Sequence, residues 1–198
     1  MKAFEELKDN LKPGTVYRRS DLLQWSNAVD RHLNQLTESK VLRKLSGGLY
    51  YYPKKTTFGE TPPKEQALVK AFLKDSRFLL LNPDVYNSLG VGTTQLYSET
   101  VVYNHKRHGV MQLGNRTYQF VRRHHFPDKL TEEFLLVDLV NNLKNLAEDS
   151  DEILETLASK VTEMNHKELV AATLEYGGVR AKKFFAKILG DRGLQHGL

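Results

Sequence analysis

Apolar positions near the start of the chain fall three or four residues apart, and this spacing predicts two short amphipathic helices in tandem. Ser20 is a suitable cap for the first helix, and Ser26 for the second. The apolar positions of the second helix form a single stripe at Ala28, Val29, Leu33 and Leu36. We therefore expect one side of this helix to be buried and its polar side to be exposed.

The next segment contains two short runs that are typical of strands. The runs 41–46 and 49–52 flank the pair Gly47-Gly48, and Gly-Gly tolerates the positive φ angles of two-residue hairpin turns. Pro53 ends the second run. Two short helices followed at once by a hairpin are the layout of a winged helix-turn-helix, which we predict for residues 1–58.

Residues 54–64 lack periodicity and contain Gly59 and Pro62-Pro63, so they read as a linker. Residues 59–198 are predicted to form a second, mixed domain with a small sheet and a C-terminal group of helices. The fold class is therefore α+β. The expected elements are helices at 65–74 and 82–89, strands at 78–81, 100–103, 109–113 and 116–122, and helices capped by Thr131 or covering 153–161, 167–174 and 179–189.

Composition narrows the class of protein. The chain has 198 residues, no cysteine and a formal net charge of +5. No apolar run approaches the length of a membrane span, so we expect a soluble cytoplasmic protein. Positive charge gathers at 40–55 and at 106–129, and negative charge at 132–155. This uneven distribution offers a basic side to nucleic acid.

The polar side of the second helix and the basic hairpin supply candidate DNA contacts. Side chains there suit phosphates or base edges in the major groove of double-stranded DNA. We expect phosphate contacts from Arg18, Arg19, Arg43 and Lys44, and base contacts from Asn27, Arg31, Asn34 and Gln35.

A second group of basic residues lies in the mixed domain. It is either another phosphate-contacting surface or simply the polar edge of a sheet. Its members are Lys106, Arg107, Arg116, Arg122 and Arg123.

Catalytic chemistry is poorly supported. The histidines His105, His108, His124 and His125 have no partner cysteine or His-Glu-x-x-His motif, so we expect no metal. Phosphate-binding and nucleophile-elbow glycine motifs are absent. We expect no catalytic residue and no cofactor.

Several segments, in order along the chain, resemble the AbiEi-type antitoxins of bacterial type IV toxin–antitoxin systems. The segments that carry this resemblance are Val41-Leu-Arg-Lys-Leu45, Gly47 to Pro53, Asn87 to Val91, Thr93-Thr-Gln95, Thr100 to Tyr103, Gly114-Asn115 and Arg122-Arg123. The resemblance implies a transcriptional repressor of its own operon, paired with a nucleotidyltransferase-like toxin.

Together these features predict a DNA-binding regulator of the antitoxin type that recognises repeats in its own promoter. A single small module buries little DNA surface, so we expect a homodimer or cooperative monomers. The alternative is a non-enzymatic adaptor whose winged module docks proteins.

Overall fold

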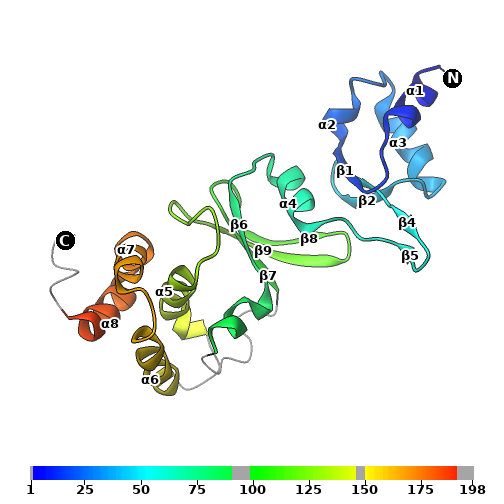
Figure 1. Ribbon diagram of the computed structural model, residues 1–198. Helices are drawn as coiled ribbons and strands as arrows, with labels where there is room; N and C mark the ends of the chain where they lie inside the picture. The colour runs from blue at the N-terminus through cyan, green and yellow to red at the C-terminus, as the bar shows by residue number, and fades with distance from the viewer. Residues whose placement is uncertain (1, 91–98, 146–149, 191–198) are drawn as a thin grey trace. The chain divides into compact units, whose positions relative to one another are not determined.

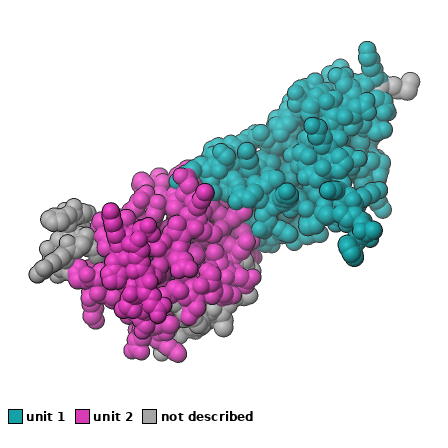
Figure 2. Space-filling view, in the orientation of Figure 1, with its two compact units in different colours: residues 1–78, 106–118 teal, residues 79–105, 119–198 magenta. Residues whose placement is uncertain are grey.

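The computed structural model describes residues 2–90, 99–145 and 150–190 (Figure 1). The chain divides into two compact units, coloured separately in Figure 2. Unit 1 comprises residues 1–78 and 106–118, and unit 2 comprises residues 79–105 and 119–198. Helices combine with small sheets along the chain, so the fold is α+β, as predicted. Residues 91 and 93–95, which contribute to the resemblance, lie outside the described part.

The N-terminal part of unit 1 contains the two short helices and the hairpin that the sequence predicts, and also helix α1 and strand β1. Its elements are α1 (Lys2–Asn10), β1 (Thr15–Arg18), α2 (Arg19–Leu22), α3 (Val29–Glu38), β2 (Arg43–Ser46) and β3 (Leu49–Tyr52). The strands form an antiparallel sheet in the order β1-β3-β2, with Thr15 opposite Tyr52 and Arg43 opposite Tyr51. Buried side chains from α1, α2 and α3, including Leu7, Leu22 and Leu33, form one core with the sheet.

The Gly47-Gly48 pair forms the predicted two-residue turn between β2 and β3. Only Gly48 has a positive φ, +70°, so the turn needs glycine at its second position and not at both. The register shifts between Lys44 and Ser46, which leaves an irregularity at Leu45.

Neither serine caps its helix as predicted. Helix α2 already begins at Arg19, and the carboxylate of Asp21 accepts a hydrogen bond from the Arg18 amide at 3.2 Å. Helix α3 begins only at Val29, and the Ser26 hydroxyl instead accepts from the Ala28 amide at 3.1 Å. Both serines lie within one turn of a helix start, but other contacts decide where each helix begins.

Residues 54–64, predicted to be an irregular linker, contain a small hairpin of β4 (Lys55–Thr56) and β5 (Gly59–Glu60). The Thr61 amide donates to the Lys54 carbonyl at 2.9 Å, and the Tyr51 hydroxyl donates to the Thr61 carbonyl at 2.9 Å. Helix α4 (Glu65–Leu73) follows. The segment is therefore ordered partly by a hydrogen bond from Tyr51, which lies outside it in β3. The residues of the segment alone do not predict this contact.

The mixed domain has the elements that the periodicity predicts. Its strands are β6 (Phe78–Leu81), β7 (Thr100–Asn104), β8 (Gly109–Leu113) and β9 (Arg116–Arg122), in the sheet order β6-β7-β9-β8. Its helices are η1 (Pro83–Leu89), α5 (Glu132–Asn142), η2 (Leu143–Asn145), α6 (Ser150–Val161), α7 (His166–Tyr176) and α8 (Val179–Leu189).

Helix α5 occupies the middle of the unit 2 core. Every residue from Phe134 to Val140 is buried, and α5 packs against η1, α7 and α8. The predicted cap is confirmed, because the Thr131 hydroxyl accepts a hydrogen bond from the Phe134 amide at 3.2 Å. A helix whose residues are buried all round, here with Asp138 as the one acid in the buried run, is typical of a core position.

The two units do not coincide with the predicted domains 1–58 and 59–198. Unit 1 continues through α4 to Phe78 and also takes in residues 106–118. Within it, Arg116 forms an ion pair with Glu65 at 3.0 Å, and the Tyr118 hydroxyl donates to the same carboxylate at 3.3 Å. Such pairings join segments that are far apart in the sequence. A domain boundary predicted from local composition does not take them into account.

Candidate nucleic-acid interface

Helix α3 has one buried side and one exposed side, as its spacing predicts. Val29, Leu33 and Leu36 are almost completely buried. The predicted base-reading residues Arg31, Asn34 and Gln35 are exposed on α3, and Asn27 is exposed just before it. Among the described residues, no side-chain partner occupies the amides of Asn27, Asn34 or Gln35. Their donors and acceptors therefore remain available to a ligand.

A buried polar pair fixes the turn that leads into α3. The Ser26 hydroxyl lies 2.8 Å from Nδ1 of His32, and the His32 ring packs edge-on against Phe4 with 5.1 Å between centroids. Burial lowers the pKa of His32, and the charge of Arg31 lowers it further. The neutral ring therefore helps to hold α3 in place beneath its exposed side.

Arg19 links the start of α2 to both α3 and the hairpin tip. Its backbone amide donates to the Gly48 carbonyl at 2.8 Å. Its guanidinium binds Asp30 on the first turn of α3 through two hydrogen bonds of 2.6 Å. Hydrogen bonding from Arg19 lowers the pKa of Asp30. The glycine tip and the exposed side of α3 are thus held together through one residue.

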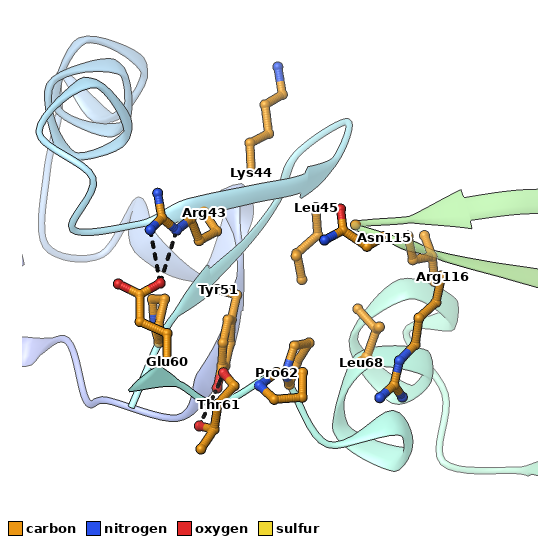
Figure 3. Close-up of a pocket in the computed structure, with 14 residues that line it drawn as sticks. Arg43, Lys44, Leu45, Tyr51, Glu60, Thr61, Pro62, Leu68, Asn115 and Arg116 are labelled. Atoms are coloured by element: carbon orange, nitrogen blue, oxygen red, sulfur yellow. Dashed lines mark hydrogen bonds and ion pairs between the residues drawn. The ribbon is translucent and has the colours of Figure 1, made fainter. Parts of the chain in front are cut away.

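The other residues predicted to contact phosphate differ in whether an acidic side chain already pairs with them. Arg18 pairs with Asp21 at 3.3 Å, and Arg43 pairs with Glu60 at 2.9 Å. Lys44 is exposed and, within the described part of the chain, forms no ion pair. Figure 3 shows its side chain extending away from the other labelled residues. Exposed ion pairs are worth little, so phosphate can replace these carboxylates at small cost.

The second predicted basic patch is distributed over both units. Lys106, Arg107 and Arg116 belong to unit 1, whereas Arg122 and Arg123 belong to unit 2. Lys106 pairs with Asp75 at 3.2 Å and Arg116 pairs with Glu65. Arg107 lies 5.7 Å from the centre of the Phe72 ring. The five residues are therefore divided between the two units, although Arg116 and Arg122 lie on the same strand, β9.

Arg123 has a structural position in unit 2. Its guanidinium lies 3.3 Å from the carboxylate of Asp138 and stacks over the ring of Tyr103 at 4.0 Å. Asp138 is completely buried and accepts hydrogen bonds from the hydroxyls of Tyr86 and Tyr103. Burial raises the pKa of Asp138 against the opposing effect of Arg123 and the tyrosines. This network fastens α5 to η1 and to the strands.

A hollow of about 360 Å³ opens in unit 1 beside β2 (Figure 3). Leu45, Tyr51 and Leu68 give it apolar walls, and Arg43 and Arg116 contribute guanidinium groups. The Gly114 amide donates to the Leu45 carbonyl at 2.8 Å beside this hollow. This hydrogen bond ties β2 to the turn between β8 and β9.

Lys74 is a basic residue that the predicted interface omitted. It lies directly after α4 in the left-handed backbone region, with a φ of +53°. With Arg18, Arg19 and Arg107 it lines a second hollow in unit 1 that also contains Gly47 and Gly48. A lysine at the end of the predicted helix 65–74 was the available signal, but its neighbours in the hollow come from distant segments.

Metal chemistry receives no geometric support in the described residues, which contain no group of three His, Asp or Glu side chains able to hold an ion. The His105 ring instead stacks on Phe126 with 4.7 Å between centroids. None of the helices within the described ranges has both the length and the apolar character that crossing a membrane requires.

These observations define an α+β protein with a helical and hairpin module in unit 1 and a helix-rich unit 2. The chain belongs to a family of unknown function, DUF6088, which matches residues 3–172. Its fold is similar to the crystal structure of the RV2827C protein from Mycobacterium tuberculosis, with a TM-score of 0.59 and 15% sequence identity. That match covers 99% of this chain and 78% of the other. A search of curated proteins gave no match.

Proposed function

We propose that the protein is a DNA-binding transcriptional regulator whose N-terminal module is a winged helix-turn-helix. The observation that carries this proposal is the exposed polar side of α3, held next to the glycine tip by Arg19. Helix α3 is the recognition helix, and the β2–β3 hairpin is the wing. Arg31, Asn34 and Gln35 contact base edges in the major groove.

The charge distribution supports this assignment. Unit 1 contains 18 Lys and Arg residues against 9 Asp and Glu, whereas unit 2 contains 11 against 15. Positive charge is therefore concentrated in the unit that carries α3 and the hairpin. Attraction to phosphates supplies most of the sequence-independent affinity of such proteins. Lys44 contacts phosphate directly, and Arg18, Arg19 and Arg43 do so by exchanging their exposed carboxylate partners.

The biological role that fits the sequence resemblance is that of an antitoxin in a type IV toxin–antitoxin pair. In this role the protein represses its own operon from promoter repeats, as a homodimer or as cooperative monomers. It acts in the cytoplasm without catalysing a reaction. The acidic, helix-rich unit 2 is the part available to a nucleotidyltransferase-like toxin.

A titration of the protein against its own upstream region, followed by gel shift at several salt concentrations, tests the proposal. We expect specific binding, with an observed affinity that falls steeply as salt increases. An unrelated duplex of equal length is the control and is expected to bind more weakly. Absence of binding, or binding without a salt dependence, would overturn DNA recognition.

The adaptor alternative makes a different prediction. If the module docks proteins, a stable protein partner copurifies from cells while nucleic acid does not. The adjacent gene also distinguishes the antitoxin from the adaptor. A nucleotidyltransferase-like reading frame beside this gene is expected only for the antitoxin.

A further inference from the structure

We propose that the hollow beside the glycine tip is a phosphate-binding site, which we call the tip hollow. It has a volume of about 360 Å³ and is lined by residues of unit 1. Its cationic residues are Arg18, Arg19, Lys74 and Arg107. The proposal rests on the proposed function in one respect, since a phosphate of bound DNA is the expected occupant.

The lining of the tip hollow is cationic, although Arg18 and Arg19 are paired with the exposed carboxylates of Asp21 and Asp30. Four cationic side chains line it, and no Asp or Glu is among the lining residues. The cations come from three separate segments: the β1–α2 junction, the end of α4, and the segment just before β8. Convergence of guanidinium and ammonium groups on one concavity favours a multiply charged oxyanion, and phosphate offers several acceptor oxygens to such donors.

The acid closest in sequence to Lys74 is engaged elsewhere. Asp75 follows Lys74 directly, but its carboxylate accepts from the Arg77 amide at 3.0 Å and pairs with Lys106 at 3.2 Å. Lys106 also donates to the Lys74 carbonyl at 2.9 Å. Among the described residues the ammonium of Lys74 has no ion pair. The backbone of Lys74 is thus fixed while its charge stays available.

The backbone around Lys74 has an unusual conformation for this residue type. Its φ of +53° lies in the left-handed region, which costs a residue with a side chain about 1 kcal/mol or more. Glycine at this helix end would avoid that cost. The chain instead has a long cationic side chain at the edge of the tip hollow.

The glycine tip leaves room for a ligand to approach the backbone. A Cβ built on Gly47 meets no atom within 4 Å, and a Cβ on Gly48 meets only Arg19, at 3.8 Å. Residues without side chains allow close approach of a phosphate to the main chain. The tip hollow therefore extends the predicted phosphate contacts from the hairpin to Arg107 and the end of α4. The sequence predicts the hairpin in one domain and these two regions in the other.

Two variants test the tip hollow directly: Lys74→Gln and Arg107→Gln. Fluorescence anisotropy of a labelled duplex from the upstream region is measured over a range of salt concentrations. We expect each variant to weaken binding about fivefold at moderate salt, and to reduce the slope of log K against log salt by about 0.9. Lys167→Gln, which removes an exposed cation from α7 in unit 2, is the matched control and is expected to change neither quantity. Thermal melts establish that each variant is folded.

A second arm distinguishes the source of the phosphate. Calorimetric titration with sodium pyrophosphate measures binding of a free phosphorylated compound to the wild type and both variants. Loss of pyrophosphate binding in the variants, with duplex binding unchanged, assigns the tip hollow to a small phosphorylated ligand. If neither variant alters duplex binding and the wild type does not bind pyrophosphate, the tip hollow is not a phosphate-binding site. DNA recognition by α3 would then still stand. If the wild type binds pyrophosphate through Lys74 but binds no duplex, the proposal of DNA recognition is overturned. The assignment of the tip hollow as a phosphate-binding site would then still stand.

Discussion

Arg31 is an exposed cation in the first half of α3, next to the buried His32. A guanidinium in this position can donate two hydrogen bonds to one guanine, so its loss affects sequence preference more than general affinity. We expect Arg31→Ala to reduce discrimination between the upstream region and an unrelated duplex by about 1–3 kcal/mol. Competition titrations with the two duplexes measure this difference.

A matched substitution separates base reading from a general loss of charge. Arg122→Ala also removes an exposed arginine, but from β9. It is expected to leave discrimination unchanged. If Arg31→Ala instead weakened both duplexes equally, Arg31 would be a phosphate contact and not a base contact.

Asp138 gives a prediction about stability and pH. Burial raises its pKa in the folded protein above the value of about 3.9 expected in the unfolded chain. Between these two values the folded state binds more protons, so this residue's contribution to stability declines as pH rises. Asp138→Asn removes the titration. Urea unfolding from pH 4 upward should show the wild type losing free energy of unfolding relative to the variant.

The sign of this effect is diagnostic. A difference that stays constant with pH would mean that Asp138 titrates alike in both states. A difference that grows in favour of the wild type would mean that pairing with Arg123 outweighs burial, and that the folded-state pKa lies below the unfolded value.

At the scale of single elements, the β2–β3 turn distinguishes its two glycines. Gly48 has a φ of +70°, whereas Gly47 lies outside the left-handed region and has open space around it. We expect Gly48→Ala to destabilise the protein by about 1–2 kcal/mol. Gly47→Ala is the control, expected to be neutral or slightly stabilising because it restricts the unfolded chain. Urea denaturation of both variants measures the difference, and equal effects would contradict the turn geometry.

Element positions were largely predictable because they depend on local patterns. Strands β8 and β9 and helix α8 have the predicted bounds, and Thr131 caps α5 as expected. Alternation, glycine turns and capping residues act over a few positions, so sequence alone records them.

Features that depend on distant partners were not predictable in the same way. The hairpin within 54–64 is fastened by Tyr51, and Arg43 is bound by Glu60, 17 residues away. Asp138 is buried in contact with Tyr86 and Arg123, which come from distant parts of the sequence. Lys74 and Arg107 line the same hollow only once the chain has folded. For the candidate interface, the exposed side of α3 was therefore predictable, whereas the pairing of its neighbouring arginines was not.

Across the whole molecule, the division of charge predicts where salt dependence originates. Helix α8 contains a row of cations at Arg180, Lys183 and Lys187, but it belongs to the unit in which acidic residues outnumber basic ones. Replacing all three with Gln is expected to leave the salt dependence of duplex binding unchanged. Replacing Arg18, Arg19 and Lys44 with Gln should reduce the slope of log K against log salt by about 0.9 per lost contact. Since both triple variants remove the same formal charge, a general electrostatic effect would lower the slope equally in both. Only a contact surface confined to unit 1 makes the two titrations differ.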